Sequence, residues 1–188
     1  MKSNPKTAWN PERLDMRAFA QAGASLQAEE PLPGFERLHA EAVLEGQSSV
    51  GLVRWQARGE MRPGATGGEP SAWLHLQADT SVPLTCQRCL GPVDTPLAVD
   101  RWFRFVADEA AAAAEDDDCE EDLLALEPRP SLHDVLEDEL LMELPLVPMH
   151  DTCPVPVTLR SGDPAVGDDD GGASPRKNPF ADLARLKK

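Results

Sequence analysis

The sequence predicts an α+β fold in which one helix packs on an antiparallel sheet, either a meander or a small open barrel. Between Phe35 and Phe105 apolar residues recur at every second position, as they do in half-buried strands. From Ser131 to Leu144 they recur every three or four residues, as on one face of a helix. The chain has 188 residues and is 41% hydrophobic, which is enough for one core with flexible ends. Residues 35–154 are therefore predicted to form a single domain.

The N-terminal half is predicted to hold a short helix followed by four strands. Residues 1–34 form an extension in which Asn10 can cap a helix and Pro11 suits its first position, because the amide that proline lacks would be unpaired there. The strands are predicted at residues 38–44, 53–58, 74–79 and 96–106.

Residues 107–122 are predicted to form an acidic loop. Nine of them are acidic and none is basic, and most of the others are alanine. Repulsion between like charges opposes the helix preference of alanine, so we expect a disordered or frayed segment. Cys119 lies inside this segment, and we expect no role for it.

The helix predicted at residues 131–144 begins with Ser131 as its cap, and Asp134 stands where a capping box normally has Glu or Gln. It ends before Pro145, because proline lacks the amide that another turn needs. The apolar stripe consists of Leu132, Val135, Leu136, Leu140 and Leu144. The acidic residues Glu137, Asp138, Glu139 and Glu143 are predicted to occupy the outer surface.

The C-terminal region is predicted to be a linker at 155–177 followed by a short basic helix at 178–188. Such a short helix is not stable alone, so it must dock either on a partner or on the protein's own sheet. The candidate RNA- or partner-binding residues are Arg176, Lys177, Asn178, Pro179, Phe180, Arg185, Lys187 and Lys188.

Charge separates the two halves of the chain. The net charge is −15; residues 1–107 hold eleven basic and twelve acidic residues, whereas residues 108–188 hold seven and twenty-one. Nucleic-acid affinity depends largely on basic side chains, so the acidic half opposes broad RNA binding and suits a basic protein partner. The acidity equally serves solubility.

Two cysteine-containing motifs have the spacing of metal ligands. Cys86 and Cys89 are separated by two residues, as in zinc knuckles, and His150 and Cys153 have the same separation. Together they would give a three-cysteine, one-histidine zinc site. The alternative is a reduced cysteine pair whose metal has been weakened or lost. A thioredoxin-type pair is less compatible, because Gly91 and Pro92 prevent a following helix.

Sequence motifs for catalysis are absent, so we do not expect an enzyme. The run Arg101–Phe105 alternates basic and aromatic residues and could stack on single-stranded RNA. It also fits an ordinary amphipathic strand, with Phe103 and Phe105 in the core and Trp102 and Arg104 exposed. No apolar run approaches the ~18 residues of a membrane helix, and the N-terminus lacks a signal-peptide core, so a cytoplasmic protein is expected.

Three motifs in order resemble the YceD family of bacterial proteins, which are described as large ribosomal RNA subunit accumulation proteins. They are CQRCL at residues 86–90, EDELLMELPLVPMH at 137–150 and NPFADLARLK at 178–187. The resemblance implies a metal-binding, β-rich protein with a role in synthesis, processing or stability of 23S ribosomal RNA. The implied partners are precursor ribosomal RNA, a basic ribosomal protein or a processing nuclease, with no membrane and no small-molecule substrate. A zinc-dependent nucleic-acid-binding module built on Cys86 and Cys89 is the alternative, and a redox or hydrolytic enzyme is the least favoured.

Overall fold

The computed structural model describes residues 9–43, 51–63, 69–116 and 119–154. Their elements are, in chain order, η1 (Pro11–Arg13), α1 (Met16–Gln21), β1 (Ser25–Pro31), η2 (Leu32–Gly34), α2 (Glu36–Glu41), β2 (Leu52–Arg62), β3 (Ser71–Thr85), β4 (Pro92–Val106), α3 (Glu109–Glu115), β5 (Asp122–Ala125) and α4 (Leu132–Met142). Within these ranges no helix is both long and apolar enough to cross a bilayer.

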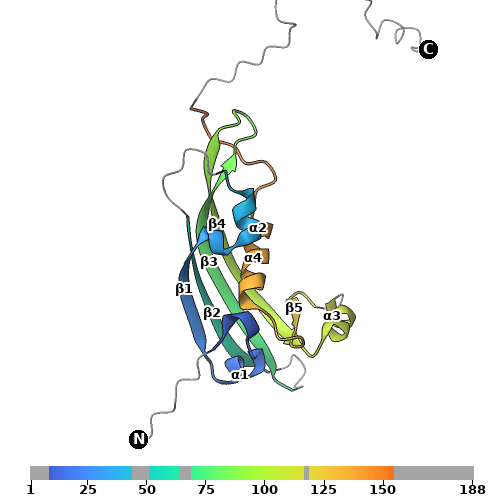
Figure 1. Ribbon diagram of the computed structural model, residues 1–188. Helices are drawn as coiled ribbons and strands as arrows, with labels where there is room; N and C mark the ends of the chain where they lie inside the picture. The colour runs from blue at the N-terminus through green and yellow to red at the C-terminus, as the bar shows by residue number, and fades with distance from the viewer. Residues whose placement is uncertain (1–8, 44–50, 64–68, 117–118, 155–188) are drawn as a thin grey trace, which may run out of the picture. The chain divides into compact units, whose positions relative to one another are not determined.

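The strands form one open sheet in the order β1-β2-β3-β4-β5, so each strand pairs with its neighbour in the chain (Figure 1). The first four strands are antiparallel, and β5 is parallel to β4. A parallel neighbour requires a crossover, and the segment that contains α3 supplies it. The predicted α+β class with an open sheet is therefore confirmed.

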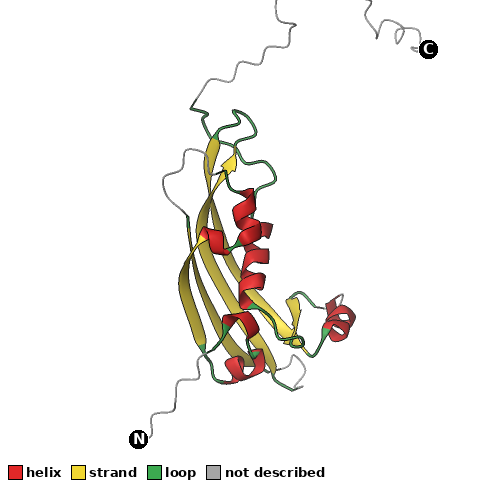
Figure 2. Cartoon of the chain, viewed as in Figure 1, coloured by secondary structure: helices red, strands yellow, loops and turns green. Residues whose placement is uncertain are grey.

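The helices α1, α2 and α4 lie over one face of the sheet (Figure 2). Alternate side chains of the strands point into this layer, including Trp55, Leu76 and Phe103. At Gly59 the layer comes very close to β2, because an added Cβ would lie 2.5 Å from Phe19 Cδ1 and 3.0 Å from the Ala20 backbone. Only glycine permits this approach of α1.

Two N-terminal elements differ from the sequence prediction. The predicted strand at residues 38–44 is wrong, because Glu36–Glu41 form α2 with Leu38 fully buried. Its alternation depended on alanines, which favour a helix equally well. The predicted extension at 1–34 also contains β1, which the sequence did not indicate. Its half-buried residues alternate with exposed ones, and Ala28 pairs with Trp55 of β2.

The acidic segment is more ordered than predicted. Glu109–Glu115 form α3, so the expectation of a disordered or frayed segment is wrong for these residues. The Asp108 carboxylate accepts a hydrogen bond from the Ala111 amide at 2.9 Å and so caps the helix. Arg104 of β4 donates to Glu115 at 2.9 Å, which offsets part of the repulsion between carboxylates.

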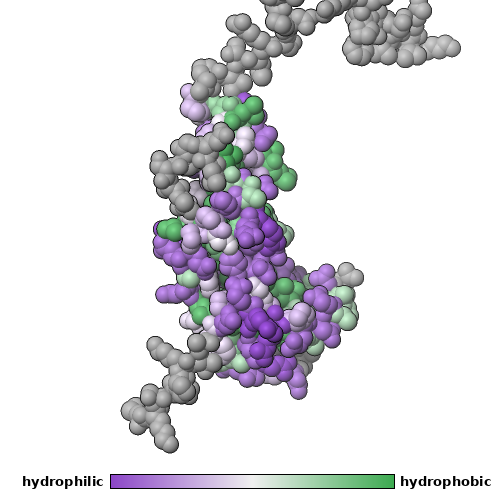
Figure 3. Space-filling view, in the orientation of Figure 1, coloured by the Kyte–Doolittle hydropathy of each residue, from purple (hydrophilic) through white to green (hydrophobic). Residues whose placement is uncertain are grey.

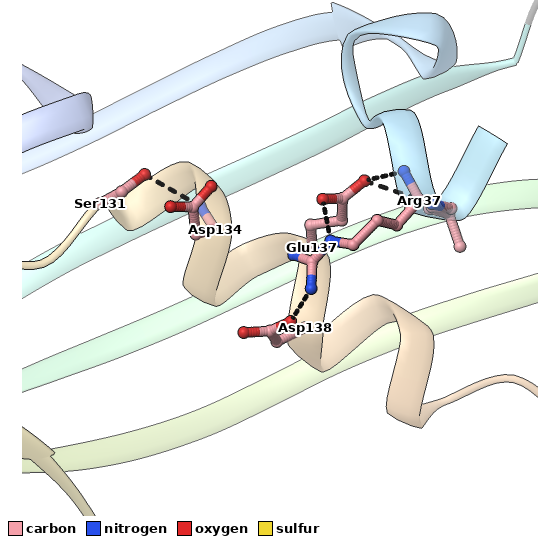
Figure 4. A network of polar contacts seen from close by, with 6 residues as sticks. Arg37, Ser131, Asp134, Glu137 and Asp138 are labelled. Carbon is pink, nitrogen blue, oxygen red and sulfur yellow. Dashed lines mark hydrogen bonds and ion pairs between the residues drawn. The ribbon is translucent and has the colours of Figure 1, made fainter. Parts of the chain in front are cut away.

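The helix α4 begins as predicted, since the Ser131 Oγ accepts a hydrogen bond from the Asp134 amide at 3.1 Å (Figure 4). Glu137, however, is 5% exposed and not on the outer surface as predicted. Its carboxylate accepts from the backbone amides of Arg37 at 2.8 Å and Leu38 at 3.2 Å, and from the Arg37 guanidinium at 2.8 Å. Glu137 thus caps α2 from another helix. The sequence could not predict this interaction, because residues 38–44 were predicted to form a strand.

Candidate metal centre

The turn that joins β3 to β4 positions the first two cysteines. The Cys86 amide donates to the Gly91 carbonyl at 2.9 Å, and the Leu90 amide donates to the Cys86 carbonyl at 2.8 Å. Leu90 has a φ of 61°, in the left-handed region that non-glycine residues seldom adopt. Cys86 is completely buried, whereas Cys89 is partly exposed at the edge of the turn.

The segment after α4 brings the other two side chains to this turn. Pro145 and Pro148 keep it extended, because proline has no amide to continue a helix and disfavours the helical region in the residue before it. The Gln87 amide donates to the Pro148 carbonyl at 2.9 Å. The His150 amide in turn donates to the Cys86 Sγ at 3.5 Å.

The four side chains predicted as ligands, Cys86, Cys89, His150 and Cys153, converge in the structure. Their ligand atoms all lie within 4.8 Å of one another. The Cys86 and Cys153 sulfurs are 4.0 Å apart, and the Cys89 sulfur lies 3.5 Å from the His150 Nδ1. Tetrahedral zinc with ordinary bond lengths would need about 3.8 Å between two sulfurs and about 3.6 Å between sulfur and nitrogen. The cluster therefore fits zinc with shifts of less than about 1 Å.

The hydrogen bonds of the cluster favour a thiolate at Cys86. Burial raises the pKa of its thiol, but the backbone amides of Cys89, His150 and Arg88 together outweigh burial and bring the pKa to about 5. The pKa of Cys153 is raised, first by burial and then by hydrogen bonds to the other two sulfurs. A divalent cation would let these sulfurs ionise together, because its charge offsets their mutual repulsion.

The donor set defines what such a centre can do. Three thiolates and an imidazole suit zinc, and four protein ligands complete a tetrahedron and leave no position for a substrate. The geometry therefore fits a structural centre and not a catalytic one. In the ranges that the structure describes, it is the one group of three or more metal-ligating side chains that meets these distances, and Cys119 is not part of it.

The other predicted binding residues, from Arg176 to Lys188, lie outside the described residues. They are Arg176, Lys177, Asn178, Pro179, Phe180, Arg185, Lys187 and Lys188. Their assignment stays a prediction.

The strand Arg101–Phe105 has the faces expected of an amphipathic strand. Phe103 and Phe105 are buried, whereas Trp102 lies on the face away from the helices. There the Trp102 ring stacks on His75 at 4.2 Å, and the Arg62 guanidinium lies 3.8 Å from the Trp102 centroid. The sequence did not indicate this stack, although alternation in β3 and β4 could have placed His75 and Trp102 on one face.

The charges of that open sheet face are balanced. Arg54 pairs with Glu29 and Asp79, both at 3.4 Å, and Arg62 pairs with Glu60. The cations of this face are thus largely neutralised, and nothing here resembles the basic surface on which RNA binding depends.

The comparisons with known proteins agree with the motifs. Residues 74–187 match the family described as the large ribosomal RNA subunit accumulation protein YceD. Neither the curated proteins nor the solved structures gave a match to the chain. The matched region is more than half of the sequence and contains all four side chains of the candidate metal centre. The chain therefore belongs to the YceD family.

Proposed function

We propose that this protein is a non-enzymatic accessory factor, in the bacterial cytoplasm, that supports the accumulation of large-subunit (23S) ribosomal RNA during ribosome biogenesis. The family match over residues 74–187 is the observation that carries the proposal. The four convergent side chains would form a closed set of metal ligands, which agrees with a structural role and not a catalytic one.

The partner that best fits the charge is a basic ribosomal protein. The helical side of the fold carries exposed carboxylates on α4 and directly after it, such as Asp134 and Glu143, and the open sheet face is balanced. A net charge of −15 attracts a basic partner and repels a polyanion. Precursor ribosomal RNA and a processing nuclease are the other partners in this proposal, with RNA contact assigned to residues 176–188.

Zinc would serve this function as a structural ion. Cys86, Cys89, His150 and Cys153 would hold it, and the bound ion would tie the β3–β4 turn to the segment after α4. These two parts of the chain are 61 to 67 residues apart in sequence, so the link closes a long loop.

The convergence of the metal ligands favours one second candidate function, a zinc-dependent nucleic-acid-binding module. In that case the knuckle at Cys86–Cys89 would itself contact RNA. Arg88 is the one cation of its turn, and its guanidinium lies 3.9 Å from the Met149 sulfur. Arg88→Ala should then lower RNA affinity, whereas the adaptor function predicts no change.

The proposal is tested by crosslinking in growing cells, with protein and RNA recovered from one sample. Recovery of a basic ribosomal protein, with RNA lost on nuclease treatment, supports the adaptor. Recovery of precursor large-subunit RNA that survives high salt supports the nucleic-acid-binding candidate. In parallel, deletion of the gene should lower the ratio of large- to small-subunit ribosomal RNA, and a normal ratio would contradict the proposed function itself.

A further inference from the structure

The surface beside the candidate metal centre is apolar and exposed. Six large apolar side chains are well exposed among the described residues, and five of them lie on the β3–β4 turn or at and beyond the end of α4. These five, which we call the knuckle patch, are Leu90, Met142, Leu146, Val147 and Met149. Leu146 is 100% exposed and Leu90 is 75% exposed, so neither contributes to the core. Exposed apolar surface of this kind typically marks an interaction site.

Figure 3 shows apolar surface at this end of the sheet, where Figure 1 draws the β3–β4 connection and the segment after α4. The two segments are held side by side. The Gln87 amide donates to the Pro148 carbonyl at 2.9 Å, and the Cys89 Sγ lies 3.5 Å from the His150 Nδ1. The knuckle patch is thus fixed before a partner arrives, which reduces the entropy lost on binding.

A groove of about 700 Å³ runs beside the patch, between the start of β4 and the segment after α4. Its apolar walls include Pro92, Val93, Pro145, Val147, Pro148 and Met149. Prolines form much of this wall, and their fixed φ keeps the groove open in one shape. An extended peptide could place apolar side chains against this wall.

The charges along the groove select among possible occupants. Asp94 and Asp151 line it, and neither lysine nor arginine does. Glu143 follows α4 close to the patch and is also exposed. Carboxylates at the rim of an apolar groove favour a partner that carries cations beside its apolar side chains.

We propose that the knuckle patch and its groove bind a basic, extended segment of a protein partner, with its apolar side chains in the groove and its cations on Asp94 and Asp151. This inference deepens the proposed function. It rests on that function only for the expectation that the partner takes part in ribosome assembly. An RNA strand is disfavoured, because its phosphates would meet two carboxylates. A second copy of this chain is disfavoured by the net charge of −15.

The experiment places the photo-crosslinking amino acid p-benzoylphenylalanine at position 146 of the full-length chain. Leu146 is fully exposed, so this replacement should leave the fold unchanged. The matched control carries the same group at position 52, because Leu52 is the sixth exposed apolar residue (42%) and lies on β2, outside the patch. The probes are total ribosomal proteins extracted from purified large subunits and, separately, purified large-subunit ribosomal RNA.

The expected result is a crosslink from position 146, and not from position 52, to a segment rich in lysine or arginine with interspersed apolar residues. Asp94→Lys should lower its yield by about fivefold, because it reverses a charge at the rim. Crosslinks to RNA, to a second copy or to a neutral or acidic segment would overturn the inference, as would equal yields from both positions or no crosslink.

A cellular measurement separates failure of this inference from failure of the proposed function. Cells that lack the gene are supplied with the wild-type chain or with Leu146→Asp. If the deletion lowers large-subunit ribosomal RNA and Leu146→Asp does not restore it, while the melting curve of that variant is normal, both ideas are supported. Full restoration by Leu146→Asp overturns the docking surface and leaves the function standing. No effect of the deletion overturns the function.

Discussion

Replacing Glu137 with alanine is expected to loosen α2 from α4. The Glu137 carboxylate accepts hydrogen bonds from the Arg37 and Leu38 amides at the start of α2, and Phe35, at the cap position, provides no side-chain hydrogen bond of its own. The variant would leave the amides of Arg37 and Leu38 without their acceptor. Leu38 is fully buried, so water could not fully replace the hydrogen bond that its amide would lose.

The expected loss of stability follows from these contacts. Removal of a helix N-cap costs about 1 kcal/mol, and a hydrogen bond to a charged group is worth about 1.5–3 kcal/mol. The guanidinium of Arg37 is half exposed and would be rehydrated, so we assign no further loss to the ion pair. The sum is a loss of about 2.5–4 kcal/mol, which corresponds to a fall in melting temperature of about 5–16 °C.

The assay is urea unfolding followed by tryptophan fluorescence at several pH values. Burial raises the pKa of Glu137, but the Arg37 side chain and the two amides outweigh burial, so its pKa lies below the ordinary value of a glutamate, 4.5. The ionised carboxylate therefore stabilises the fold above about pH 4.5, and this contribution is lost as the pH falls through the lower, folded-state pKa. The difference in stability between wild type and Glu137→Ala should accordingly be full at pH 7 and shrink below pH 4.5.

The matched control is Asp138→Asn. Asp138 pairs with the same arginine, but its side chain is 56% exposed, so a change within about 0.5 kcal/mol is expected. The reasoning would be refuted if Glu137→Ala were as stable as Asp138→Asn.

Three further predictions concern a close approach in the core, the metal and the C-terminus. Gly59→Ala should lower stability by about 1–3 kcal/mol, because its Cβ would clash with Phe19 and the Ala20 backbone, whereas Gly34→Ala, with nothing within 4 Å, should change little in the same urea assay. Cys86→Ser with Cys89→Ser should abolish bound zinc, measured by elemental analysis of the purified protein, and should lower the melting temperature. Cys119→Ser, outside the cluster, should retain both the bound zinc and the wild-type melting temperature. If the double variant has the same melting temperature as wild type, both with and without a chelator, a structural metal is excluded. Deletion of residues 178–188 should lower large-subunit ribosomal RNA while the melting curve of the body stays normal; normal RNA levels would contradict a role for this segment.

The sequence predicted the elements correctly where the spacing of the apolar residues fits only a strand or only a helix. The strands around Trp55 and Leu76 and the helix after Ser131 were found because the apolar spacing was regular over enough residues. The α2 segment failed this condition, since short runs with alanine fit both a strand and a helix. The β1 strand was missed because its inward positions are Leu26, Ala28 and Glu30, of which only one is strongly apolar.

The candidate metal centre was predicted because the two-residue spacing within each pair of ligands, Cys86 with Cys89 and His150 with Cys153, is visible in the sequence. The distance between the two pairs could not be predicted, since it depends on the length of β4 and on the direction in which the chain leaves α4. The inward position of Glu137 was equally hidden. A carboxylate on a helix is normally an exposed residue, and only a second helix that presents unpaired amides makes its burial favourable.

The segment after α4 is the part of the fold that would depend most on a bound metal. Ordering a residue costs about 1–2 kcal/mol of backbone entropy, and burial of apolar side chains normally offsets that cost. Here Leu146 and Val147 are exposed, so burial contributes little, and the contacts that hold the segment are hydrogen bonds to the turn and the converging sulfur and imidazole ligands.

Metal removal should therefore free this segment before it affects the sheet. With chelator, amide hydrogen exchange is expected to rise at residues 146–153, while the amides of β2 and β3 remain protected, because the sheet has its own core. The Cys119→Ser variant serves as the control that still holds metal. Uniform loss of protection across the sheet would show that the centre supports the whole fold, and unchanged exchange at residues 146–153 would show that the hydrogen bonds to Gln87 and Cys86 suffice without a metal.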